Sequence, residues 1–395
     1  MGFFYMSNFD IVLFDDIQWK QLFPLTLSRP CSLIRVGMST IADKWKQSLG
    51  NTHTYYHTAD YLRERFKPSM ASEALLVNGA TLPTPDLVTA IQNLPKGVLL
   101  KSGEINVAFK LDDYNYEHAL GDILSGLPTQ QIDSVELLQY PEDILRLNDV
   151  WIERDFKRED IGILGHIDVD TKVIGSPEQI HIGAGAMVHA QSINTTDGPV
   201  YIGKDVLVME GAMLRGPLVI QDRSVIKMGA KIYGKTSIGN RCKIGGEVKR
   251  AVIHCHSNKG HDGYLGDSVI GEWCNFGADS NNSNMKNTYG KVNLYDIAVG
   301  QKRKTDEQFL GMIMGDHCRC AINTQFNTGT VAAYFANIFG EPPSTYIKPF
   351  QWGEGGVYDL DKAIAVTRLV YERRAMSFTA GDETIIRHIF QAYAQ

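Results

Sequence analysis

The pattern of apolar and polar residues changes once along the chain. From Asp10 to about residue 125, short apolar runs alternate with amphipathic segments. The runs typical of buried strands are IVLF at 11–14, ALLVN at 74–78 and VLLK at 98–101. Between the last two, Thr84, Pro85 and Asp86 supply a helix N-cap, a proline at the first helical position and an early acid. This alternation predicts a mainly parallel α/β sheet with helices on its faces.

From about residue 165 a six-residue period takes over. Aliphatic side chains recur without a break at Ile202, Val208, Leu214, Ile220, Ile226, Ile232, Ile238 and Ile244. Several are followed by glycine, as at Ile182-Gly183 and Ile238-Gly239. This period fits neither an α-helix nor a simple strand, but it is typical of a parallel β-helix built from hexapeptides. The register therefore predicts a coil whose aliphatic side chains fill its interior.

Two segments of the coil depart from this six-residue register. In solenoids, insertions map to loops on one face, and such loops often bind ligands. Segments 245–263 and 280–311 are rich in His, Asn and Lys. We expect them to be insertions that carry chemistry, the alternative being ordinary solvated loops.

The stretch 245–284 contains a dense set of motifs. It includes E-V-K, then G-H-x-x-Y-x-G-D, then N-x-G-A and a later Asn. These motifs resemble the active-site region of the bifunctional N-acetylglucosamine-1-phosphate uridylyltransferase/glucosamine-1-phosphate acetyltransferase family. The resemblance implies a Rossmann-like sugar-nucleotidyltransferase domain, a left-handed parallel β-helix and a homotrimer.

The patterns and the resemblance together divide the chain into four parts. The last part has two segments with helical spacing, which we expect to cap the coil, because the end of a solenoid must be covered. The parts are an α/β domain at 1–140, a helical connector at 141–165, a β-helix at 166–340, and an extended segment with a helical cap at 341–395.

The resemblance also assigns roles to single residues of the coil. His261 takes the position of a general base that removes a proton from a sugar amine, which suits an imidazole near neutral pH. The substrate-binding positions are Lys231, Lys249, Tyr264 and Asn275. The positions expected to contact acetyl-coenzyme A are Ala278, Asn284, Asn323 and Thr324. Lys231 replaces an arginine of the family, so the charge is kept and the bidentate fork is lost.

The nucleotidyltransferase motifs are only partly present. The remnant comprises Leu25, Thr26, Arg29, Asn78 and Gly79. The glycines that let backbone N–H groups approach phosphates are missing, and Asp15 and Asp16 place negative charge there instead. We therefore expect Mg²⁺ only if this site is active, and no other metal site is predicted.

Composition narrows the set of partners. The 395 residues contain 39 Lys+Arg and 45 Asp+Glu, a formal charge of −6, which argues against a basic nucleic-acid binder. No apolar run reaches the ~18 residues that a membrane helix needs, and no signal peptide is recognisable, so we expect a cytoplasmic protein without a membrane partner. Phosphorylated ligands would then need local cationic clusters, for which Lys231, Lys243, Lys249 and Arg250 are candidates.

Three functions follow for comparison. The favoured one is an acetyl-coenzyme A-dependent N-acetyltransferase acting on an amino-sugar phosphate or nucleotide sugar, with a degenerate nucleotidyltransferase domain attached. The alternative is a sugar-1-phosphate nucleotidyltransferase that uses a nucleoside triphosphate for uridylyl or thymidylyl transfer, with the coil serving trimerisation. The third is a non-enzymatic trimeric binding or scaffold protein.

Overall fold

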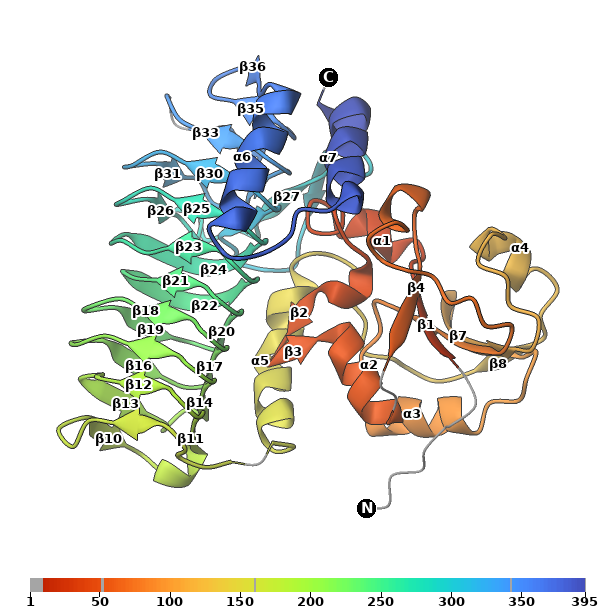
Figure 1. The fold of residues 1–395 in the computed structure, drawn as a ribbon, viewed down its shortest axis with the longest axis horizontal. Coiled ribbons are helices and arrows are strands. Elements are labelled where there is room, and N and C mark those ends of the chain that lie inside the picture. The colour runs from red at the N-terminus through yellow and green to blue at the C-terminus, as the bar shows by residue number, and fades with distance from the viewer. Residues whose placement is uncertain (1–9, 51–52, 160, 342, 395) are drawn as a thin grey trace.

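The protein consists of an α/β domain and a long parallel β-solenoid that lie side by side (Figure 1). This computed structural model describes residues 10–50, 53–159, 161–341 and 343–394. The connecting helix α5 (Asp143–Phe156) runs between the two bodies. In the part of the chain that is described, no helix has both the length and the apolar character needed to cross a bilayer.

The α/β domain is built on a six-stranded sheet with the order β4-β1-β5-β7-β6-β8. Its strands are β1 (Asp10–Phe14), β4 (Thr54–His57), β5 (Ala74–Asn78), β6 (Leu99–Ser102), β7 (Ile105–Leu111) and β8 (Thr129–Gln131). A small hairpin, β2 (Arg35–Val36) with β3 (Ser39–Thr40), lies outside this sheet. Its helices are α1 (Gln18–Gln21), α2 (Ile41–Leu49), α3 (Pro85–Gln92) and α4 (Leu120–Leu124), with 3-10 turns η1 (Cys31–Leu33) and η2 (Asp60–Leu62).

The sheet is mainly parallel, as predicted, because five of its six strands run in one direction and β7 runs against them. The predicted strands β1, β5 and β6 run in the same direction, and β4, which was not predicted, pairs parallel with β1; β7 pairs antiparallel with both β5 and β6. A tight turn joins β6 to β7, with Ser102 opposite Ile105, and such a short loop can only join antiparallel strands. Helix α3 is confirmed where Thr84 was expected to cap it, since the Thr84 hydroxyl accepts from Leu87 N (3.4 Å).

The solenoid strands form long ladders on the faces of the coil. Their pairs are parallel except at the C-terminal end of one ladder, where β36 (Gly356–Val357) pairs antiparallel with β35 (Gln351–Trp352). One ladder contains β9 (His166–Ile167), β12 (Met187–Val188), β15 (Leu207–Val208), β18 (Val225–Ile226), β21 (Lys243–Ile244), β23 (Asn258–Lys259), β25 (Asn275–Phe276), β30 (Arg319–Cys320), β33 (Asn337–Ile338), β35 (Gln351–Trp352) and β36 (Gly356–Val357). The larger ladder contains β10 (Lys172–Ile174), β11 (Ile180–Ile182), β13 (Ser192–Asn194), β14 (Val200–Ile202), β16 (Met213–Arg215), β17 (Leu218–Ile220), β19 (Lys231–Tyr233), β20 (Thr236–Ile238), β22 (Glu247–Ile253), β24 (Tyr264–Ile270), β29 (Met312–Met314), β32 (Thr330–Ala332) and β34 (Tyr346–Ile347). The short pair β26 (Asn281–Asn282) and β31 (Gln325–Phe326) completes the coil, and a 3-10 turn, η3 (Pro177–Gln179), precedes β11.

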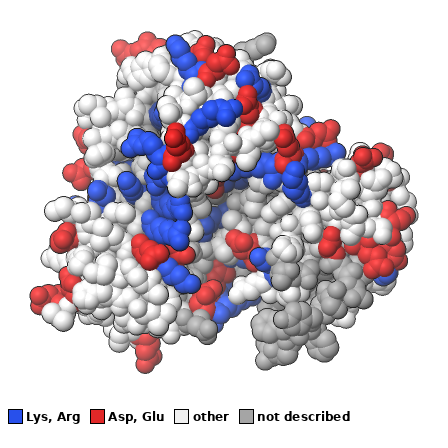
Figure 2. Space-filling model, viewed as in Figure 1, with Lys and Arg blue, Asp and Glu red and all other residues white. Residues whose placement is uncertain are grey.

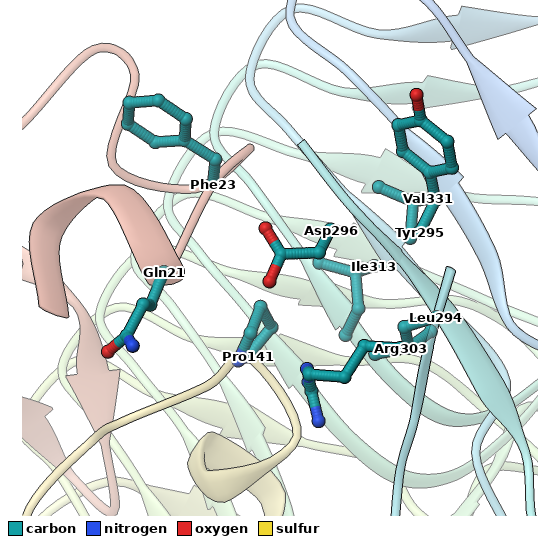
Figure 3. Close-up of a pocket in the computed structure, with 9 residues that line it drawn as sticks. All are labelled: Gln21, Phe23, Pro141, Leu294, Tyr295, Asp296, Arg303, Ile313 and Val331. Atoms are coloured by element: carbon teal, nitrogen blue, oxygen red, sulfur yellow. The ribbon is translucent and has the colours of Figure 1, made fainter. Parts of the chain in front are cut away.

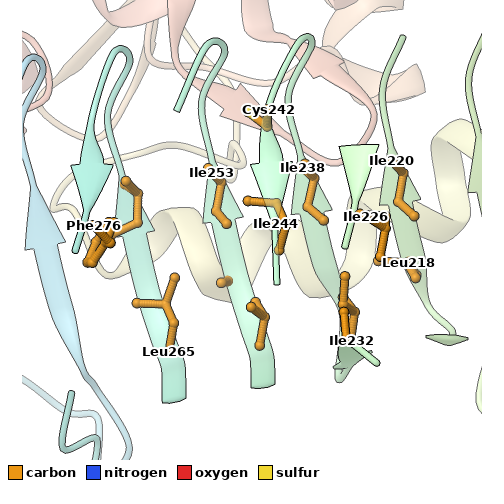
Figure 4. Close-up of a cluster of buried hydrophobic side chains, with 14 of the residues drawn as sticks. Leu218, Ile220, Ile226, Ile232, Ile238, Cys242, Ile244, Ile253, Leu265 and Phe276 are labelled. Atoms are coloured by element: carbon orange, nitrogen blue, oxygen red, sulfur yellow. The ribbon is translucent and has the colours of Figure 1, made fainter. Parts of the chain in front are cut away.

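The hexapeptide register is confirmed by the packing. All eight aliphatic residues of the unbroken run are at most 1% exposed and belong to one hydrophobic cluster. Ile202, Ile220 and Ile238 are direct partners on successive coils, eighteen residues apart. Figure 4 shows such side chains stacked inside the coil. Because apolar burial is the main source of stability, this stack is what holds the coil together.

One predicted insertion is real and the other is a shortened coil. Ile238 pairs with Ile253 only fifteen residues later, because β22 runs through a corner without turning. Segment 245–263 is therefore a shortened coil, which corrects the expectation of an insertion. By contrast, Ile270 pairs with Met314, and the extra chain between them forms the hairpin β27 (Asn293–Asp296) and β28 (Gln301–Lys304).

The C-terminal helices α6 (Leu360–Glu372) and α7 (Ala380–Tyr393) are present as expected. The coil continues past the predicted boundary at residue 340 into β34 and β35, so the end of the coil is formed by strands. Helix α6 lies along the flank of the coil, where Tyr371 stacks on Trp273 with ring centroids 4.5 Å apart. Helix α7 packs on the α/β domain, where His388 stacks on Tyr61 at 3.9 Å.

A buried ion pair joins the α/β domain to the coil. The Asp316 carboxylate, in the coil, accepts hydrogen bonds from the Ser28 hydroxyl and the Arg29 guanidinium. Its other oxygen accepts from Glu272 N at 2.7 Å, and the Glu272 carboxylate lies 3.3 Å from Arg29. Burial acts to raise the pKa of Asp316, but the neighbouring Arg29 outweighs it and holds that pKa below its ordinary value.

Further bonds fix the same interface. Arg35 N donates to His254 Nε2 (3.1 Å), and His254 Nδ1 donates to the carbonyl of Ile270 (3.0 Å). Burial lowers the pKa of His254 to about 3, which keeps the ring neutral and both bonds in place. In α5, the Asn148 side chain accepts from Gly37 N of one body and from the Ser237 hydroxyl of the other, each at 2.8 Å.

We expect Asp316→Asn to destabilise the protein by about 3 kcal/mol, because it leaves the Arg29 guanidinium buried without its main counter-charge. Urea unfolding would measure this loss. The matched control is Asp197→Asn, which breaks a solvent-exposed pair with Arg215 and should cost less than about 1 kcal/mol. Equal effects of the two substitutions would contradict the role assigned to Asp316.

Candidate functional site

One edge of the coil brings several predicted site residues together. His261 lies in the corner between β23 and β24 and is exposed. Successive corners stack on it, since Asp279 N donates to the Asp262 carbonyl (3.1 Å) and Asn323 N donates to the Ala278 carbonyl (2.8 Å). His261, Ala278 and Asn323 therefore follow one another along a single edge.

A buried lysine supports the His261 corner from inside the coil. Lys259 is the register partner of Ile244, so it takes an interior position that aliphatic residues hold in neighbouring coils. Its ammonium donates to the carbonyls of His261 (2.7 Å) and Asp262 (3.1 Å). Burial lowers the pKa of Lys259 to about 8. Lys259 is not among the site residues predicted from the sequence, although its place in the shortened coil is the signal that identifies it.

Three predicted substrate-binding residues lie on the face that follows this edge. Lys231, Glu247 and Tyr264 form one outward row, because they are register partners on successive strands. Lys249 lies in the adjacent outward row, as the partner of Gly266. Two ammonium groups and a phenol therefore share one surface next to the His261 corner.

The hydroxyl of Tyr264 is oriented by a short chain of bonds. Asn284 Nδ2 donates to the Tyr264 hydroxyl oxygen (3.1 Å) and to the buried Asp267 carboxylate (2.6 Å). Burial raises the pKa of Tyr264 to about 12, so the phenol keeps its proton at neutral pH. Because Asn284 occupies the oxygen as a donor, the Tyr264 proton is free to be donated to a ligand. The structure thus places Asn284, which was expected at the coenzyme, beside Tyr264, which was predicted to bind substrate.

The insertion after β26 borders this surface. The Lys249 ammonium lies 5.9 Å from the centre of the Phe309 ring, a cation–π distance. Arg250 points elsewhere and contacts Asp149 (3.0 Å), Asp267 (3.2 Å) and Glu307 (3.8 Å). With three carboxylates around it, Arg250 is a structural residue, which corrects its proposed part in a phosphate-attracting cluster.

Two other predicted residues lie apart from this surface. Asn275 lies on the face of the coil that precedes the His261 corner, in a row with Lys243. Within one chain it is therefore on a different face from Lys249 and Tyr264. Thr324 is buried and its hydroxyl donates to the Ala321 carbonyl (2.8 Å), so that hydroxyl is not available to a coenzyme.

The predicted nucleotide-site residues are inside the protein. Leu25, Thr26, Arg29, Asn78 and Gly79 are all buried. Thr26 donates to the Trp19 carbonyl, Asn78 donates to the Asn106 carbonyl (2.9 Å), and Arg29 holds Asp316. The polar groups of this predicted remnant are therefore engaged within the fold.

Asp15 and a small cavity, both near the predicted nucleotide-site residues, are also part of the protein interior. Asp15 accepts bonds from Cys31 N (2.8 Å) and the Thr58 hydroxyl, and burial raises its pKa to about 6. Where the segment meets the insertion, Figure 3 shows a cavity lined by residues such as Gln21, Asp296 and Arg303. Its volume is about 10 Å³, which suits a single water molecule and not a nucleotide.

Comparisons with known proteins agree with the resemblance found in the sequence. Residues 11–160 match the family described as sugar nucleotidyl transferase. Proteins named bifunctional protein GlmU are similar to this chain. That of Methanocaldococcus jannaschii is 36% identical over 24% of this chain and 21% of its own length. That of Rippkaea orientalis is 28% identical over 40% and 36%, and that of Methanococcus aeolicus is 26% identical over 61% and 56%.

The chain thus matches between about a fifth and just over half of the length of these relatives. Together with the α/β domain, the parallel β-solenoid and the C-terminal helices, these matches confirm the resemblance to GlmU-like proteins.

We expect Lys259→Met to remove a pH dependence of stability. The Lys259 pKa is about 8 in the folded state against an ordinary 10.5, so between these values the unfolded chain binds more protons. The free energy of unfolding of the wild type should therefore rise from pH 8 to pH 10.5, by up to about 3 kcal/mol relative to the variant.

Urea unfolding of both proteins at pH 7 and pH 10 measures this difference. Lys172→Met, which changes an exposed lysine of the same coil, serves as the control and should not show it. A constant difference between wild type and Lys259→Met across this range would contradict the buried ammonium.

Proposed function

We propose that this GlmU-like chain is an N-acetyltransferase that acetylates the amino group of a sugar phosphate or nucleotide sugar, with acetyl-coenzyme A as acyl donor. One observation carries the proposal. The Lys249 ammonium and the oriented Tyr264 hydroxyl share a surface beside the corner that holds His261. An ammonium and a phenol suit a phosphate, and an exposed imidazole suits proton removal from an amine.

The chemistry assigned to each residue is simple. Lys231 and Lys249 attract and hold the sugar phosphate, and the Tyr264 hydroxyl donates a hydrogen bond to a phosphate oxygen. His261 would accept the proton that the sugar amine loses as its nitrogen bonds to the acetyl carbon. The thioester C–S bond would break in the same transfer, and the coenzyme would leave as its thiol after the proton returns to sulfur. The side chains of Lys259 and Asn284 take no part in the reaction: the Lys259 ammonium fixes the backbone of the His261 corner, and the Asn284 amide fixes the Tyr264 hydroxyl.

The acetyl donor fits along the same edge. Ala278 presents a small side chain there, and the neighbouring Asn323 is exposed, so the corner row offers backbone and amide groups to an extended amide-containing ligand. When bound, acetyl-coenzyme A supplies an activated thioester. We include a cytoplasmic location in this proposal, because acetyl-coenzyme A and a polar sugar phosphate would both have to be available to the protein there.

A homotrimer is the assembly that we propose. His261 is exposed, and its imidazole has no hydrogen-bond partner among the described residues. Asn275 lies on the face on the other side of the edge. The solenoid of a neighbouring subunit would cover the His261 edge and exclude water from the reacting groups. It would also bring a second set of residues to the ligand.

Sugar-1-phosphate nucleotidyl transfer is a second candidate, favoured by the family match over residues 11–160. It requires a nucleoside triphosphate and Mg²⁺ near segments whose remnant residues are buried and internally bonded. Release of pyrophosphate from a triphosphate and a sugar 1-phosphate would support it. A protein that releases none and binds no nucleotide would refute it.

The test of the favoured function is a screen of amino-sugar phosphates with acetyl-coenzyme A, followed by detection of the free thiol. On the substrate that turns over, we expect His261→Ala to lower turnover by about 10²–10⁴-fold, the usual contribution of general-base catalysis. The unfolding temperature should stay unchanged, because the side chain is exposed.

His166→Ala is the matched control, since it removes another exposed imidazole of the coil far from this edge. Unchanged turnover in His261→Ala would remove His261 from its role. If no amino sugar turns over and acetyl-coenzyme A does not raise the unfolding temperature, the scaffold interpretation is favoured instead.

A further inference from the structure

A second surface of the coil forms a pocket with α6. Its volume is about 440 Å³, and it lies between the C-terminal end of α6 and the face that carries β21, β23, β25 and β30. The polar side chains that define it are Lys243, Asn258, Asn275, Arg319, Arg373 and Arg374. Figure 2 shows basic side chains gathered where α6 meets the coil.

The coil supplies one wall of this pocket as a straight row. Lys243, Asn258, Asn275 and Arg319 are register partners on four successive strands. Neighbouring strands lie about 4.8 Å apart, so the row spans roughly 14 Å. Cationic groups stand at its two ends and two amides stand between them.

Helix α6 supplies the other wall and adds more positive charge. Arg374 donates to the Arg241 carbonyl (3.0 Å) and to Asn258 Oδ1 (3.1 Å), while Arg241 donates in return to the Arg374 carbonyl (3.0 Å). Two guanidinium groups are thus held together by backbone carbonyls. Burial lowers the pKa of Arg374, and the nearby Arg241 and Arg373 act in the same direction.

The positive charge of this pocket is not neutralised within the chain. Among residues 10–50, 53–159, 161–341 and 343–394, no carboxylate lies within ion-pair distance of Lys243, Arg319, Arg373 or Arg374. Arg250, which is also in the coil, has three such partners. Like charges placed together without counter-charges destabilise a fold, so the cluster indicates an anionic ligand.

We infer that this pocket binds the phosphate-bearing part of a small molecule that also carries hydroxyl or amide groups. The cationic ends of the row suit phosphate oxygens, and the two asparagine amides between them can donate to and accept from such polar groups. The Trp273 ring is already stacked on two side chains of the same chain, His256 at 4.1 Å and Tyr371 at 4.5 Å, so it is the charged and amide groups that indicate a ligand. The inference goes beyond the proposed acetyl transfer and does not depend on His261.

The first experiment uses inorganic pyrophosphate as probe, with isothermal titration calorimetry at low salt on the full chain. We expect binding to the wild type and a loss of about tenfold or more in Arg319→Gln and in Arg373→Gln, because charge-assisted hydrogen bonds are removed. Neither side chain has a hydrogen bond to the rest of the described chain, and Arg373 is exposed, so both variants should fold. Lys172→Gln removes an equal charge elsewhere on the coil and should bind like the wild type.

Further probes distinguish the sources of the phosphate. If coenzyme A loses affinity in Arg319→Gln and dephospho-coenzyme A binds weakly to both proteins, the coenzyme 3′-phosphate is the ligand. If glucosamine 1-phosphate loses affinity in the same variant, a sugar phosphate is the ligand. The inference is overturned if no probe binds, or if all bind the two variants as they bind the wild type.

This readout separates the two proposals. His261→Ala should retain full affinity for pyrophosphate, whereas Arg319→Gln should lose it whatever the fate of acetyl transfer.

Discussion

The Asp316 carboxylate is the constraint around which the two bodies are arranged. It bonds to the neighbouring coil through Glu272 N and to the α/β domain through Ser28 and Arg29. A buried charge must keep its partners, so these contacts fix the loop that follows β1 against the coil. That loop is the place where a nucleotidyltransferase would hold phosphates. In this protein its polar groups maintain the contact between domains, and the exposed polar chemistry lies on the coil.

The parts of the fold that were predictable are those with a local pattern. The stack from Ile202 to Ile244 follows from a six-residue period, and α3 follows from its Thr84 cap, because each depends on residues close in sequence. The antiparallel β7 was missed although a turn signal precedes it, since Ser102-Gly103 marks a turn and Gly103 has the positive φ (57°) that a two-residue hairpin loop favours. The shortened coil was missed because β22 keeps strand composition through a corner where the others bend. That missed step also concealed Lys259, which only the corrected register places inside the coil.

The candidate site was predictable residue by residue but not as an arrangement. The motifs identified His261, Lys249 and Tyr264, and the structure places them around one edge. Asn275 comes from the next motif, N-x-G-A, and lies on the preceding face, because a few residues along the chain are enough to turn a corner. Neighbours in a solenoid are found one coil apart, so contacts such as Asn284 with Tyr264 depend on coil length, which no single motif reports. The unpaired cations beside α6 were hidden for the same reason.

The row from Lys243 to Arg319 has a property that follows from its backbone. Its spacing is set by hydrogen bonds between coils and by the apolar stack beneath, neither of which involves the outward side chains. Outward side chains on this face therefore repeat at a fixed distance, which is the rise from one coil to the next. An exchange of one outward residue alters the chemistry at one height and leaves every other height in place. The preference of this face for a longer or shorter ligand can thus be changed by substituting one outward residue on one coil, while the core stays as it is.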